Sequence, residues 1–212
     1  SGKVTMTEEI FRDDAYAKSC EATVVSVDEA GIELSRTVFY YQSGGQPGDT
    51  GILTATDGHI VQIADTRMDR GAGRHLHIPA SGTIKLAPGD SVTATIDWER
   101  RYRLMRMHTL LHLICATVDA DITGCQIGLE KSRIDLNTEG KPDKGSIQAQ
   151  LDEFVAKDLP TSALWITDEQ LALQPEIVKN MSVRPPTGIG KVRLIAVEGI
   201  DLQPCGGTHV AS

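Results

Sequence analysis

The sequence predicts an α+β protein with a strand-rich first half and a second half that mixes helices with strands. Two observations lead to this prediction. Short β-branched segments alternate with Gly-rich turns up to residue 97, and a long stretch without glycine or proline follows. A chain of 212 residues can hold two modest domains. We therefore expect one domain over residues 1–97 and a second over residues 98–212.

Five segments of the first half have the composition of β-strands. They are β-branched or alternate between apolar and polar residues, and turn sequences such as Asp57-Gly58 and Pro88-Gly89 separate them. This many short strands with Gly-rich turns predicts a small barrel or a sandwich. The segments are Ala22–Val27, Gly31–Leu34, Thr37–Tyr40, His59–Asp65 and Ser91–Asp97.

The second half has a helical character. Trp98–Asp119 contains no glycine or proline and is rich in Arg, Leu and Met, which predicts one long helix. Ile147–Lys157 and Asp168–Leu173 are two shorter helical stretches, and Lys191–Val197 has the composition of a strand.

The charge of the chain limits how it can bind nucleic acid. The formal net charge is −8, whereas proteins that hold nucleic acid by overall charge are usually basic. Any contact with RNA must then come from a local patch. Four arginines could meet phosphates or could simply form a solvated helix face, and both interpretations stay open. They are Arg100, Arg101, Arg103 and Arg106.

The remaining composition points to the cytoplasm. No apolar run approaches the length that spans a bilayer, and the N-terminus lacks the pattern of a secretory signal, so we expect no membrane partner. Four cysteines with wide, irregular spacing fit free thiols or metal ligands better than a disulfide framework. They are Cys20, Cys115, Cys125 and Cys205. The sequence is compatible with a monomer or a homodimer.

Two motifs together predict a metal site. His108 and His112 are four residues apart in the long predicted helix, so both imidazoles can reach one ion. Cys205 and His209 are separated by a segment with two glycines, which allows the backbone to bring both side chains together. One thiolate and three imidazoles form a plausible tetrahedral set for a single zinc ion. The alternative for the second motif is a plain turn with an exposed histidine.

The residue after the first histidine argues against a zinc protease. Such an enzyme has a glutamate there as its general base. Here the position is Thr109, and no glutamate lies between His108 and His112.

The segment Tyr40–Gly51 contains four glycines in twelve residues. Such a loop can bring backbone amides close to phosphate or sugar. It lacks the Gly-Lys-Ser/Thr ending of a P-loop, and no helix pattern follows it. From its chemistry alone, a bulged hairpin of the β-domain is the better interpretation.

Three segments, in this order, resemble one family: Phe39–Gly51, Met107–His112 and Gln203–His209. Together they are similar to the editing domain of alanyl-tRNA synthetase and to its free-standing relatives, the AlaX trans-editing proteins of medium length. The resemblance implies an N-terminal β-barrel-like domain followed by an α+β editing domain of the threonyl/alanyl-tRNA synthetase type. It also implies hydrolysis of mischarged tRNA(Ala), chiefly seryl-tRNA(Ala) and in addition glycyl-tRNA(Ala).

The resemblance also suggests roles for further residues. Cys125–Gly128 and Arg133–Asp135 are similar to the pocket strands of the family, so Gln126 and Thr123 are candidate catalytic residues that contact the serine hydroxyl or the terminal ribose. The four arginines are candidates for tRNA phosphates. Glycine-rich positions are candidates for holding the acceptor end of the tRNA: Gly44, Gly45, Gln46, Gly206 and Gly207.

The sequence departs from the family pattern at two places. Ser43 stands where the family often has the first of three glycines, and the family usually continues past the last histidine with a further hairpin, whereas this chain ends at Ser212. Either the tail is disordered or cut away, or this member is short, so a tRNA contact from such a tail stays an open question. Two alternatives remain: an editing fragment of a full-length alanyl-tRNA synthetase, and a non-catalytic tRNA-binding relative.

Overall fold

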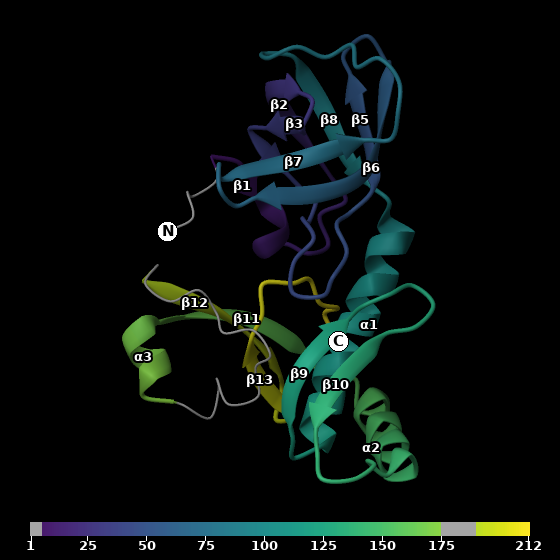
Figure 1. The fold of residues 1–212 in the computed structure, drawn as a ribbon, viewed down its shortest axis with the longest axis vertical. Helices are drawn as coiled ribbons and strands as arrows, with labels where there is room; N and C mark the ends of the chain where they lie inside the picture. Colours follow the sequence, from purple (N-terminus) through teal and green to yellow (C-terminus); the bar gives the residue numbers. More distant parts are fainter. Residues whose placement is uncertain (1–5, 175–189) are drawn as a thin grey trace. The chain divides into compact units, whose positions relative to one another are not determined.

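The structure, a computed structural model, describes residues 6–174 and 190–212 (Figure 1). The chain forms two compact units, Ser1–Arg103 and Leu104–Ser212. The division between them falls inside the long helix α1 (Trp98–Thr117). The sequence predicted a boundary between two functional domains after residue 97, and that boundary stays a prediction.

The first unit contains a closed barrel of antiparallel strands in the order β2-β3-β7-β6-β5-β8 (Figure 1). The prediction of a barrel-like domain is therefore confirmed. The strands are β2 (Ser19–Asp28), β3 (Gly31–Leu34), β5 (Gly51–Ala55), β6 (Ile60–Asp69), β7 (Arg74–Pro79) and β8 (Ser91–Ile96).

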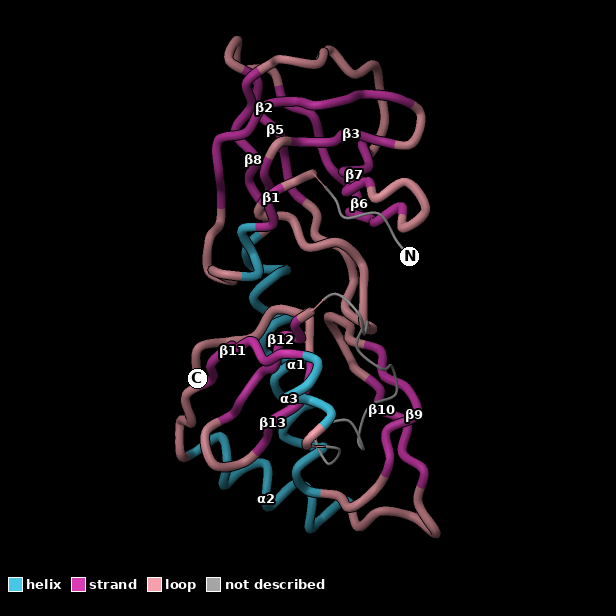
Figure 2. Tube along the Cα trace, turned by 90° about the vertical axis from the view of Figure 1, so that its left-hand side faces the viewer, coloured by secondary structure: helices cyan, strands magenta, loops and turns pink. Residues whose placement is uncertain are grey.

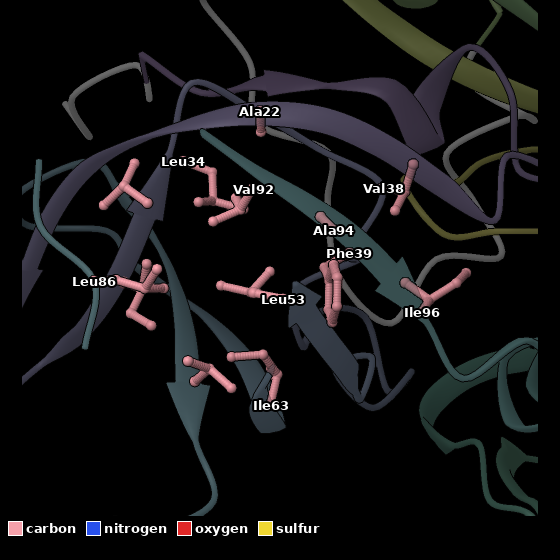
Figure 3. Close-up of a cluster of buried hydrophobic side chains, with 13 residues drawn as sticks. Ala22, Leu34, Val38, Phe39, Leu53, Ile63, Leu86, Val92, Ala94 and Ile96 are labelled. Carbon is pink, nitrogen blue, oxygen red and sulfur yellow. The ribbon is translucent and has the colours of Figure 1, made fainter. Parts of the chain in front are cut away.

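Apolar side chains from alternate strand positions fill the barrel. In β8, Val92, Ala94 and Ile96 are buried, while the residues between them are partly exposed. Figure 3 shows side chains from several strands pointing into the same core, among them Leu34 and Leu53, which are fully buried. The period of two along each strand thus produces one continuous core.

The prediction of a strand over Thr37–Tyr40 is wrong after Thr37. Only β4 (Arg36–Thr37) forms, and it pairs in parallel with β1 (Glu8–Glu9) next to the short helix η1 (Ile10–Arg12). The amide of Phe39 donates to Thr37 Oγ1, and the amide of Tyr40 donates to Asp49 Oδ2. Because side chains accept these amides, no neighbouring strand can pair with them.

The glycine-rich segment forms a tight hairpin turn. Ser43 and Gln46 exchange two backbone hydrogen bonds, and Gly44 and Gly45 between them have φ values of 57° and 84°. Positive φ at both central positions is the geometry of a type I′ turn. The predicted bulged hairpin is thus present only as a tight turn, because Ser43 and Gln46 form an isolated bridge rather than the ends of two strands.

The second unit contains two separate groups of strands (Figure 2). β9 (Asp121–Gln126) and β10 (Arg133–Asn137) form a hairpin. β11 (Thr161–Thr167), β12 (Lys191–Val197) and β13 (Asp201–Pro204) form an antiparallel sheet. Helices α2 (Lys144–Ala156) and α3 (Asp168–Ala172) complete the unit.

The part of α1 in this unit packs on two sides. Leu111 joins Ile127 and residues of the β9–β10 hairpin in one apolar cluster. Leu113 joins Leu151 of α2 and Val197 of β12 in another. The α+β class predicted for this half is confirmed. No helix in the described part of the chain is long and apolar enough to cross a membrane.

Candidate metal centre

Four side chains from two distant segments meet in the second unit. His108 and His112 lie on adjacent turns of α1, and Cys205 and His209 follow β13. The three histidines are buried, and one ligand atom from each of the four residues lies within 4.8 Å of the others. All four residues predicted as metal ligands are therefore brought together.

The distances within this cluster fit a metal ion. Cys205 Sγ lies 3.4 Å from His108 Nε2 and 3.3 Å from His209 Nε2. In a tetrahedral zinc site with ordinary bond lengths, sulfur and nitrogen ligands are roughly 3.5 Å apart. The donor set and its spacing therefore suit a metal ion.

Arg193 holds the turn that carries the last two ligands. Its Nη1 donates to the carbonyl oxygens of Cys205, at 2.8 Å, and Gly207, at 3.0 Å. The amide of Cys205 donates back to the carbonyl of Arg193, and the amide of Gly207 donates to Cys205 Sγ at 3.3 Å. The turn after β13 is thus fixed by a buried guanidinium on the neighbouring strand β12.

His112 faces a carboxylate on the side away from the cluster. Its Nδ1 is buried, and Asp201 Oδ2 lies 3.5 Å away, slightly beyond a good hydrogen bond. Burial lowers the pKa of the His112 imidazole, but Asp201 and Cys205 more than offset this effect and raise the pKa to about 9. The surroundings of His112 therefore favour positive charge.

Two further ligands, Cys205 and His209, are in forms that suit metal binding. Burial raises the pKa of the Cys205 thiol, but His108 and His209 outweigh it and hold the pKa well below its usual value. Burial holds the pKa of His209 well below its usual value, so its imidazole is neutral at pH 7. A thiolate and neutral imidazoles are the forms that bind metals.

The two candidate catalytic residues lie on β9, and both side chains are exposed. Thr123 Oγ1 donates to the carbonyl of Asp135 at 3.3 Å. Within the described residues, neither Thr123 nor Gln126 forms a hydrogen bond to the four ligands. Cys125 between them packs in the apolar cluster with Leu111, and its thiol pKa is raised by burial and by Cys205 nearby. The roles of Thr123 and Gln126 stay predictions.

Arg101 corrects the prediction that all four arginines contact phosphate. It is fully buried and donates to both carboxylate oxygens of Asp49 and to the carbonyl of Val38. A guanidinium committed in this way cannot reach tRNA. Arg100 is half-buried and donates to the carbonyl of Gly48, whereas Arg103 and Arg106 are exposed.

The glycine-rich positions differ in exposure. Gly44, Gly45 and Gly206 are exposed, while the side chain of Gln46 is fully buried. Gly207 is also buried, and its amide and carbonyl are used within the ligand turn. A contact of these five residues with the acceptor end stays a prediction.

Sequence reasoning missed Arg193 and Asp201. Neither belongs to a motif, and Arg193 is twelve residues from Cys205 in sequence. Strand pairing between β12 and β13 brings Arg193 next to Cys205. Asp201 meets His112 of α1, which is far away in the sequence, through the tertiary fold. Among the residues that the structure describes, none of the four cysteines forms a disulfide bond.

The chain is similar in sequence to known proteins. Residues 5–100 match a family model described as tRNA synthetases class II (A). The chain is 36% identical to the alanyl-tRNA editing protein AlaX-M of Methanosarcina barkeri over 97% of its own length and 88% of the relative.

The chain belongs to the AlaX family of alanyl-tRNA editing proteins. It is also 32% identical to AlaX-L of Pyrococcus horikoshii, of which it covers 52%. Against the alanine–tRNA ligase of Sulfurisphaera tokodaii the identity is 29%, and the chain covers 23% of that protein. AlaX-like sequence therefore also occurs as one part of longer proteins.

Proposed function

We propose that this protein is a zinc-dependent trans-editing hydrolase that deacylates mischarged tRNA(Ala), chiefly seryl-tRNA(Ala), with glycyl-tRNA(Ala) as a second substrate. The observation that carries the proposal is the cluster of His108, His112, Cys205 and His209, in a chain whose relatives are named alanyl-tRNA editing proteins. Cytoplasmic action remains the expectation from the sequence.

The bond to be broken is the ester between the amino acid and a ribose hydroxyl of the terminal adenosine of tRNA. Water attacks the carbonyl carbon, and negative charge develops on the carbonyl oxygen. The bond from the carbonyl carbon to the ribose oxygen then breaks, the ribose oxygen takes up a proton that the attacking water has lost, and the amino acid leaves as its carboxylate. Zinc can polarise a carbonyl, lower the pKa of a water molecule or orient a substrate when it is bound. A set of four protein ligands is typical of closed zinc sites. Neighbouring side chains must then discriminate between the amino acids.

Serine differs from alanine by one hydroxyl. A site that hydrogen-bonds this hydroxyl disfavours alanine, because its own polar group then loses a partner. Gln126 is our first candidate for this contact and Thr123 the second. Both lie on β9, the strand that resembles the pocket strands of the family, and their exposed side chains are accessible to a substrate, which supports the assignment.

The experiment is deacylation of seryl-, glycyl- and alanyl-tRNA(Ala) by the purified protein, with metal analysis of the same samples. We expect the seryl ester to be lost preferentially. His108→Ala and Cys205→Ala should lose zinc and activity. The matched controls His59→Ala and Cys20→Ala change residues of the first unit and should keep both.

Gln126→Ala separates chemistry from metal binding. It should retain zinc and lose about tenfold in the deacylation rate, the factor that corresponds to a lost hydrogen bond of ~1.4 kcal/mol. Equal hydrolysis of seryl and alanyl esters by the unaltered protein would refute the substrate assignment. Full zinc content in both ligand variants would refute the metal site.

The alternative of an editing part of an alanine–tRNA ligase rests on the similarity to that enzyme. It predicts the same hydrolysis by the same residues. A non-catalytic relative predicts tRNA binding without loss of the seryl ester, so the deacylation assay distinguishes it.

A further inference from the structure

Thr109 occupies the position where a zinc protease carries its catalytic glutamate, and the structure uses it differently. The residue is buried in α1 between the two helical ligands. Thr109 Oγ1 lies 3.0 Å from His209 Nδ1 and accepts the amide of Val210 at 3.3 Å. One hydroxyl on the helix therefore contacts the C-terminal segment that carries His209.

The two nitrogens of His209 face different partners. Nδ1 faces Thr109, whereas Nε2 faces Cys205 Sγ at 3.3 Å, inside the ligand cluster. A ligating nitrogen must offer its lone pair to the metal, and a neutral imidazole carries only one N–H. If Nε2 binds the metal, the proton must be on Nδ1, where Thr109 Oγ1 can accept it.

We propose that Thr109 is a positioning residue that holds His209 in the Nδ1–H tautomer and fixes its ring, so that Nε2 is presented to the metal. The proposal rests on the metal centre proposed above and assigns Thr109 no role in bond breaking. A hydroxyl oxygen has two lone pairs, so it can accept both His209 Nδ1–H and the amide of Val210.

This arrangement connects the two halves of the metal centre. Thr109 is the sequence neighbour of His108, and His209 is 100 residues away from Thr109. When a partner that holds a ligating histidine by its second nitrogen is removed, metal affinity typically falls roughly 10- to 100-fold. The hydrogen bond from His209 thus orients one ligand, and the bond from Val210 keeps its segment against the helix.

The test compares zinc affinities, measured by competition with a chelator, for the full chain and three variants. Thr109→Val keeps the shape of the side chain but removes the acceptor, and we expect zinc binding to weaken roughly 10- to 100-fold. Thr109→Ser keeps the hydroxyl and should bind zinc like the unaltered protein. Thr117→Val is the matched control, because Thr117 in the same helix donates to the carbonyl of Ile114 at 2.7 Å. It should leave zinc affinity unchanged.

A second readout does not depend on the folding of Thr109→Val. In the zinc-loaded protein, long-range ¹H–¹⁵N NMR spectra of the histidines should show the proton of His209 on Nδ1. A proton on Nε2 would overturn the proposal, as would a Thr109→Val variant with unaltered affinity. Equal losses in Thr109→Ser and Thr109→Val would also contradict it, because the hydroxyl would then not be the important group.

The zinc measurements distinguish failure of the role of Thr109 from failure of the proposed function. If the unaltered protein binds no zinc, both proposals fail. If it binds zinc and Thr109→Val binds it equally well, only the role of Thr109 is wrong. Neither measurement uses tRNA, so loss of the substrate assignment leaves the result intact.

Discussion

Arg101 and Asp49 show how far the environment of one residue changes its role. In the sequence, Arg101 is one of four arginines in a short basic run. In the structure, both side chains are buried and paired, with Arg101 Nε 2.9 Å from Asp49 Oδ2. Asp49 Oδ2 also accepts the amide of Tyr40. This pair therefore ties the first turn of α1 to the glycine-rich segment.

Removing one partner of this pair should destabilise the protein strongly. Asp49→Ala leaves the buried Arg101 guanidinium without its counter-ion, and breaking such a pair costs about 3–5 kcal/mol in the free energy of unfolding. Urea unfolding measures the change. Arg103→Ala is the control, because Arg103 is exposed and such substitutions stay within about 0.5 kcal/mol. Equal stabilities of the two variants would contradict the role given to the pair.

At the scale of elements, the barrel contains two buried histidines that carry no metal role. His77 on β7 lies 2.8 Å from the carbonyl of Ile32 through Nδ1 and 2.8 Å from Thr37 Oγ1 through Nε2. These bonds connect β7 to β3 and β4. Burial lowers the pKa of His77 to about 4, and burial also holds the pKa of neighbouring His75 well below its usual value.

The barrel should therefore lose stability in mild acid. The unfolded chain binds a proton at His77 below about pH 6.5, while the folded barrel binds it only near pH 4. The stabilisation that neutral His77 contributes is therefore complete above the pKa of His77 in the unfolded chain. It decreases as the pH falls toward the pKa of His77 in the folded barrel. From pH 7 to pH 5 we expect a loss on the order of 2 kcal/mol from His77.

Urea unfolding at a series of pH values measures this loss. His77→Gln should reduce the pH dependence and leave the part that comes from buried His75. His59→Ala changes a half-buried histidine of the same unit that pairs with Asp57, and it should keep the full pH dependence. A pH profile of His77→Gln that equals the unaltered one would show that another group is responsible.

Also at the scale of elements, helices were easier to predict than strands. The predicted helix from Trp98 begins at that residue, and α1 ends at Thr117 rather than at Asp119. Both α2 and α3 form where expected, with Asp143 and Thr167 as caps. By contrast, β1, β5, β7, β11 and β13 were not predicted. Helical hydrogen bonds are local, whereas a strand depends on a partner far away in the sequence.

At the scale of the whole molecule, a net charge of −8 must be reconciled with binding of tRNA. Arg103 and Arg106 are exposed and three residues apart on α1, so they share one side of the helix. We predict that Arg103→Ala and Arg106→Ala each reduce the slope of log affinity against log salt by about 1, as expected for one lost phosphate contact.

Binding of tRNA(Ala) measured over a range of salt concentrations tests this prediction. Lys157→Ala is a suitable control, because Lys157 pairs with Glu153 at 2.7 Å after α2. It should leave the slope unchanged. If both arginine variants also keep the original slope, the basic run of α1 is a solvated face and not a phosphate contact.

Taken by itself, the sequence determined the strand-rich first half, the long helix, the family and the four candidate ligands. These depend on local spacing: a period of two in strands, a spacing of four in the helix, and glycines beside Cys205. Only the tertiary structure decided that Arg101 is buried against Asp49, that Arg193 holds the ligand turn, and that Thr109 meets His209 across 100 residues. Burial and contact partners of a side chain depend on strand pairing and core packing, which no local pattern contains.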